Sequence, residues 1–129
     1  MSLVTVKQGL YTTLNAIPAL TGLVYKYIPM TIHTEKLLYI RLMDVVRVNA
    51  SHTVVTYRLL ARLLVVYQDI EGAETILDGL INSIPAAVNA NPTLGGTAEI
   101  ATIANINSDP PIIDINGTAC RYADFEVEI

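Results

Sequence analysis

Hydrophobic and polar residues alternate along residues 52–68, HTVVTYRLLARLLVVYQ. The odd positions from 55 to 67 are all apolar or aromatic, whereas Arg58 and Arg62 lie among the even ones. Because side chains alternate faces along a β-strand, this pattern predicts one apolar face and one mixed face. A helix would put the two arginines on one side with Leu59 and Leu63. We therefore expect a long, central, largely buried strand whose second face carries two arginines.

Two segments have the three- and four-residue spacing of amphipathic helices. The stripes are Leu3, Val6, Leu10, Leu14 and Ile17 in the first, and Ala73, Ile76, Leu77, Leu80, Ile81 and Ile84 in the second. Ser2 or Thr5 is a candidate cap for the first helix, and Pro18 ends it near Ile17. Asp69 is a candidate cap for the second helix, and Pro85 ends or kinks it.

The remaining segments are predicted as strands. Residues 23–28, 36–48, 97–106 and 118–129 have strand patterns, and residues 112–115 form a candidate short strand before the Asn116-Gly117 turn. Residues 36–48 and the central strand should form an antiparallel hairpin. The order is α-β-β-β-α-β-β, which predicts a single α+β domain over residues 1–129. Its two layers would be a mostly antiparallel sheet of about five strands and two helices on one face.

Composition adds limits on function. The chain has 129 residues, of which 52% are hydrophobic and 16% charged, and oligomerisation is the ordinary way to cover such surplus apolar surface. No apolar run reaches the roughly 18 residues of a membrane span, and we expect neither a signal peptide nor a membrane partner. The net charge of −4 argues against a protein that grips nucleic acid through phosphates. The single cysteine, Cys120, excludes an internal disulfide and favours synthesis in a reducing cytoplasm.

Candidate chemistry is sparse. Glu71, Glu74 and Asp78 share a helical face, which is typical of a divalent metal site, of an acid–base pair or of a solvated surface. We favour the solvated surface, because no histidine follows at i+3 or i+4. His33 and His52 lie beside turns without a triad pattern, and Cys120 is expected to be a small buried hydrophobe. We therefore predict no catalytic, cofactor-binding or metal-binding residues and no enzyme activity.

Two features are candidates for a subunit interface. Arg58 and Arg62 lie about 13 Å apart along one strand face, so they should pair either with acids of their own subunit or with acids of a neighbour. The other feature is the loop over residues 107–116, which suits either a contact arm or a plain hairpin end. Its candidate contact residues are Asp109, Pro110, Pro111, Ile112, Ile113 and Asp114.

Several local strings follow one another in a distinctive order. They are the Ile17-Pro18-Ala19-Leu20-Thr21-Gly22-Leu23-Val24-Tyr25 end of the first helix, the short strand that reaches Pro29, the long hairpin, the Tyr67-Gln68-Asp69 step into the second helix and the Leu94-Gly95-Gly96 turn. In these strings the chain resembles the tail terminator proteins of long-tailed bacteriophages. The resemblance covers nearly the whole chain as a pattern of elements.

The resemblance implies a homohexameric ring around a central channel. Such a ring caps the head-proximal end of the tail tube and contacts the tube protein and the head–tail connector in the neck of the virion. It implies no catalytic residues, and DNA would pass the mildly acidic channel without specific binding. The alternative, from another class, is a small α+β ligand-binding or regulatory domain that works as a dimer. We predict that Arg58→Glu with Arg62→Glu leaves the protomer folded but weakens assembly.

Overall fold

The computed structural model describes residues 2–29, 32, 34–47, 55–66, 70–98, 100–108, 112–115 and 117–129. In chain order the elements are α1 (Leu3–Asn15), the 3₁₀ turn η1 (Pro18–Leu20), β1 (Val24–Tyr25), β2 (Lys36–Arg47), β3 (Val55–Val66), α2 (Ile70–Ala90), β4 (Thr102–Asn107), β5 (Ile112–Ile115) and β6 (Thr118–Glu128). The predicted α+β class is confirmed. Over the described residues the sheet has six strands rather than about five, because residues 112–115 do form the short strand β5.

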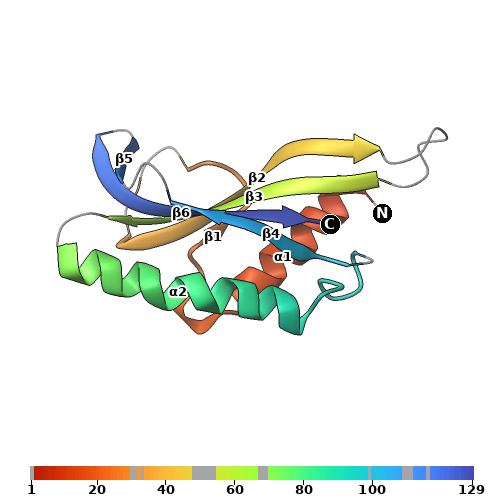
Figure 1. The fold of residues 1–129 in the computed structure, drawn as a ribbon, viewed down its shortest axis with the longest axis horizontal. Helices are drawn as coiled ribbons and strands as arrows, with labels where there is room; N and C mark the ends of the chain where they lie inside the picture. Colours follow the sequence, from red (N-terminus) through yellow and green to blue (C-terminus); the bar gives the residue numbers. More distant parts are fainter. Residues whose placement is uncertain are drawn as a thin grey trace.

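The strands form one sheet in the order β1-β2-β3-β6-β4, and β5 pairs with β6 beyond the end of β4. Only the β1–β2 pairing is parallel; the other pairings of the described strands are antiparallel. The predicted β2–β3 hairpin is confirmed over nearly the full length of both strands. Its connection and the proposed cap Asp69 lie outside the described residues. As predicted, β3 is central, with β2 and β6 on its two sides (Figure 1).

Both helices pack against the same face of the sheet, which is the lower side in Figure 1. The core between the layers combines the helical stripes with alternate strand residues. On β3 these are the odd residues Leu59, Ala61, Leu63 and Val65, all fully buried. Burial of this strand face from Leu59 to Val65 follows directly from the two-residue period of the sequence.

Helix α1 begins as predicted, because the Ser2 hydroxyl accepts a hydrogen bond from the Thr5 amide at 3.2 Å. Gly9 lies inside α1, where glycine is a poor helix former, and its presence there has a structural reason. A β-carbon at Gly9 would lie 1.9 Å from Thr97 Oγ1 and 2.8 Å from the carbonyl oxygen of Leu94. The glycine therefore lets the turn before β4 contact α1 directly.

Helix α2 does not end at Pro85 but continues to Ala90. Proline removes one helical N–H, which costs stability. In return, the extra turn buries Val88 completely, four residues after the buried Ile84. Packing of this face against the core outweighs the local preference.

Strand β4 begins at Thr102 rather than at residue 97, because the preceding residues form a compact turn. Leu94, Gly95 and Gly96 all have positive φ angles of 50°, 72° and 90°. The Ala101 amide then donates to the carbonyl of Pro92 at 2.6 Å, which holds the chain in the turn until the strand starts. The predicted strand at 23–28 is likewise shortened, to β1, and the Nζ of the following Lys26 donates to Gln8 Oε1 of α1 at 2.7 Å.

Candidate functional site: the open face of the sheet

The sheet face opposite the two helices, here called the open face, carries most of the ionic contacts of the described chain. The strand register places these side chains on it: Leu37, Tyr39, Arg41, Asp44 and Val46 of β2; Thr56, Arg58, Leu60, Arg62, Leu64 and Val66 of β3; and Cys120, Tyr122, Asp124, Glu126 and Glu128 of β6. No described helix packs on this face (Figure 1).

Arg62 is paired within its own chain. Its guanidinium donates to both carboxylate oxygens of Asp124, at 2.7 Å and 2.8 Å, and lies 5.1 Å above the ring of Tyr122. The hydrogen bond to Asp124 raises the pKa of Arg62, and burial opposes that shift. This two-pronged geometry holds both side chains in one orientation.

Arg58 also has partners in its own chain, but in a more exposed setting. Its Nη1 donates to Asp44 Oδ2 at 3.1 Å, and its Nε lies 3.9 Å from Glu128 Oε1. Of the two alternatives for these arginines, the structure therefore shows pairing within the subunit. Neither arginine needs a neighbour to balance its charge, so the double charge reversal is a poor test of an interface. A glutamate at position 62 would face Asp124 and destabilise the protomer itself.

The end of the open face near β5 is apolar. Leu37, Tyr39, Leu64, Cys120 and Tyr122 form a second buried cluster, and Tyr25, Ile32 and Ile113 pack against it. Cys120 is fully buried, which confirms its predicted role as a small hydrophobe. Burial and then the nearby Asp114 carboxylate raise the pKa of its thiol, so the reactive thiolate is disfavoured.

The candidate contact loop falls into two parts. Asp109, Pro110 and Pro111 lie outside the described residues, as do His33 and His52. Of its two candidate isoleucines, Ile112 is exposed, whereas Ile113 packs against the second cluster. Asp114 accepts a hydrogen bond from the Gly117 amide at 2.7 Å, so it stabilises the β5–β6 turn.

The acidic face of α2 is only partly a solvated surface. Glu71 and Asp78 are exposed, but Glu74 binds the guanidinium of Arg121 on β6 through two contacts of 2.6 Å and 3.2 Å. This hydrogen bond lowers the pKa of Glu74. Periodicity did not reveal the pair, because Arg121 lies 47 residues away in the sequence. Among the described residues, no three His, Cys, Asp or Glu side chains come together as a metal site.

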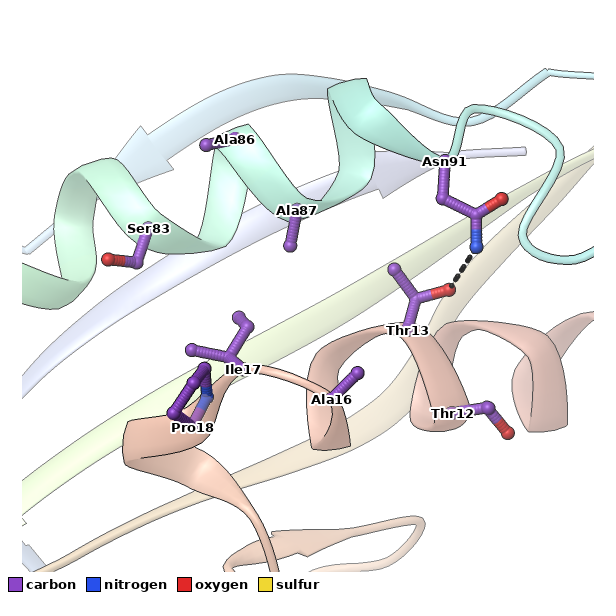
Figure 2. Close-up of a pocket in the computed structure, with 9 residues that line it drawn as sticks. All are labelled: Thr12, Thr13, Ala16, Ile17, Pro18, Ser83, Ala86, Ala87 and Asn91. Carbon is purple, nitrogen blue, oxygen red and sulfur yellow. Dashed lines mark hydrogen bonds between the residues drawn. The ribbon is translucent and has the colours of Figure 1, made fainter.

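A groove runs between the two helices on the other side of the molecule. Figure 2 shows its lining: Thr12, Thr13, Ala16, Ile17, Pro18, Ser83, Ala86, Ala87 and Asn91. The side-chain amide of Asn91 donates to the Thr13 hydroxyl at 3.2 Å across the helix–helix contact. This polar pair thus joins α1 to the end of α2, and the rest of the lining is made mainly of small side chains.

No protein-family model matches the chain, and no curated protein is significantly similar to it. No helix within the described ranges combines the length and the apolar character that crossing a membrane requires.

Proposed function

We propose that this chain is a structural subunit that assembles with its own copies into a ring at the end of a phage tail tube. In this role it would resemble a tail terminator, closing the head-proximal end of the tube and joining it to the neck. The open face of the sheet is the observation that carries the proposal. No described helix covers it, and away from its apolar end near β5 its charged side chains are arranged as a hydrophilic wall.

The charge of this wall suits a channel for DNA. Its carboxylates are Asp44, Asp124, Glu126 and Glu128, and its guanidiniums are Arg41, Arg58 and Arg62. The carboxylates outnumber the guanidiniums by one, and both Arg58 and Arg62 are held by acids of their own chain. Arginines that are already paired offer little to a phosphate, and the excess negative charge repels it. In a ring with this face inward, DNA would pass without binding.

Exposed apolar side chains elsewhere on the protomer support self-association. Val4 is 78% exposed, Tyr27 65% and Ile100 63%. Single exposed hydrophobes are ordinary, but these lie at three separate places of a small domain: in α1, after β1 and before β4. A ring in which each copy contacts two neighbours would cover several such sites at once.

The solution mass tests the proposal. We expect the purified protein to form a species near six times 14.0 kDa that appears as a ring with a central hole in negative-stain electron micrographs. The same preparation should not retard double-stranded DNA at physiological salt. A protein that stays monomeric at high concentration would overturn the ring.

The alternative is a ligand-binding or regulatory dimer, and the groove between α1 and α2 is the feature that favours it. A mass near two times 14.0 kDa, with a small molecule protecting Thr13 or Asn91 from hydrogen exchange, would support the dimer instead.

A further inference from the structure

The sheet has two long edges that pair with no other described strand. One is the outer edge of β4, the last strand in the sheet order. The other is the part of β2 beyond β1, over residues 40–47, because β1 pairs only with Leu38 and Tyr39. Free strand edges attract further strands, and proteins commonly block them with charges or prolines. Residues 100–108, which include β4, contain neither, and β4 carries only a bulge at residue 104.

The backbone groups that point outward along β4 follow from the ladder. Tyr57 and Ile129 exchange both of their backbone hydrogen bonds at 2.9 Å, so Ile129 faces β3. Facing direction alternates along an antiparallel strand. Glu128, Glu126 and Asp124 therefore face β4, where they pair with Thr102, Asn105 and Asn107. The amide and carbonyl groups of Ile103 and Ile106 are left pointing to the outer edge.

The same alternation applies to β2. Leu42 pairs with Leu59, and Val45 pairs with Tyr57; these β3 residues face β6. Leu42 and Val45 therefore present their own backbone groups to the outer edge. Leu38 confirms this direction. It pairs with Leu63, an odd-numbered residue of β3 like Leu59 and Tyr57, and its amide donates outward to the carbonyl oxygen of Leu23 at 2.9 Å.

The side chains at the two edges match as well. Ile103 and Ile106 lie on the helix-side face, opposite Val127 and Phe125, and so do Leu42 and Val45. Val45 is 40% exposed and Ile106 39%, so the protomer leaves apolar surface beside both edges. On the open face, β4 adds the uncharged Thr102, Asn105 and Asn107. Joining the edges would continue an apolar layer on one side and a polar layer on the other.

We propose that β4 of one copy pairs antiparallel with the free part of β2 in the next copy. In one sheet β2 and β4 run in opposite directions, so copies placed side by side in the same orientation meet as antiparallel strands. Ile103 and Ile106 are three positions apart, as are Leu42 and Val45. One register therefore sets Ile103 opposite Val45 and Ile106 opposite Leu42, so that the outward amide and carbonyl groups of all four residues are paired. This head-to-tail contact uses different surfaces on each copy, as ring closure requires, and it rests on the proposed ring.

Disulfide trapping tests the pairing in the assembled protein. In the variant Val45→Cys/Ile103→Cys, opposite side chains on one face come close enough for a disulfide. Mild oxidation should give a ladder of covalent multimers on a non-reducing gel. The matched control is Val46→Cys/Ile103→Cys: Val46 is 38% exposed but lies on the other face, so it should give no ladder. The unmodified chain, with its single buried Cys120, serves as the blank.

The solution mass, measured before oxidation, separates this inference from the proposed function. A ring that forms without cross-links in the Val45 variant, or with equal cross-links in the control, overturns the strand pairing and leaves the ring standing. A protein with no assembly beyond a dimer overturns both. As a second variant, Ile106→Pro removes an outward amide but no bond to β6, so it should give folded protomers that do not assemble. Ile106→Val should assemble normally, and assembly by the proline variant would contradict the pairing.

Discussion

At the scale of single residues, the Arg62–Asp124 ion pair is the ionic contact whose removal should lower the free energy of unfolding most. The Asp124 side chain is only 14% exposed, so removing the guanidinium leaves a poorly solvated carboxylate. We predict that Arg62→Met lowers the free energy of unfolding by about 2 kcal/mol. Urea denaturation at neutral pH measures the loss.

Arg58 provides the matched control. Its side chain is 34% exposed and that of its partner Asp44 is 50% exposed, so water screens the pair. Arg58→Met should cost less than about 1 kcal/mol. Equal losses in the two variants would show that burial does not distinguish the pairs.

At Gly9 the local preference for a good helix former and a tertiary contact favour different residues. Alanine is the better helix former by up to about 1 kcal/mol, yet the added carbon would collide with Thr97 and with the backbone of Leu94. We predict that Gly9→Ala destabilises the protein by about 1–2 kcal/mol. In Gly79→Ala, on the exposed side of α2, the new carbon meets nothing within 4 Å, so this variant should be neutral or slightly more stable. Thermal and urea unfolding of the two variants, side by side, would reveal the opposite signs.

At the scale of elements, the Glu74–Arg121 pair joins α2 to β6 and should make stability depend on pH. The pKa of Glu74 in the folded protein lies below its ordinary value of 4.5. The pair therefore contributes stability above pH 4.5, and this contribution is lost as the pH falls through the folded-state pKa. We predict that Glu74→Gln flattens the acid side of the stability curve, measured by denaturation between pH 7 and pH 3.

The exposed Glu71, on the same helix, is the control for this pH effect. Glu71→Gln should retain the acid sensitivity of the unmodified protein, because no ion pair of Glu71 is seen in the described chain. If Glu74→Gln loses stability in acid as steeply as the parent, another carboxylate is responsible.

At the scale of the whole molecule, ring assembly would link stability to concentration. A protomer whose free edges are covered only in the assembly gains apparent stability by mass action. We predict that a tenfold rise in protein concentration raises Tm by about 4 °C. Ile103→Lys, which places a charge at the outer edge of β4, should make Tm nearly independent of concentration. A concentration-independent Tm in the unmodified protein would contradict obligate assembly.

The sequence by itself determined the class of fold, because that depends on local periodicity. The two-residue alternation around Arg58 and Arg62 identified the central strand, the three- and four-residue spacing identified both helices, and Asn116-Gly117 marked a turn between two strands that do pair. Each of these signals arises from side chains within a few positions of one another. An arginine-bearing sheet face without a helix layer could be expected from the same pattern.

The tertiary structure alone decided which distant groups meet. Arg62 pairs with Asp124, which lies 62 residues away in the sequence, and Arg121 pairs with Glu74, which lies 47 residues away. No local pattern encodes such partners. The same holds for Gly9, which is needed only because residues 94–97 pack directly against α1. It also holds for Pro85, where the burial of Val88 outweighs the loss of one helical hydrogen bond. The two free edges, and the direction in which their amides point, also follow from strand order. Strand order is set by packing of the whole chain, because hydrophobic burial depends on total area and not on sequence distance.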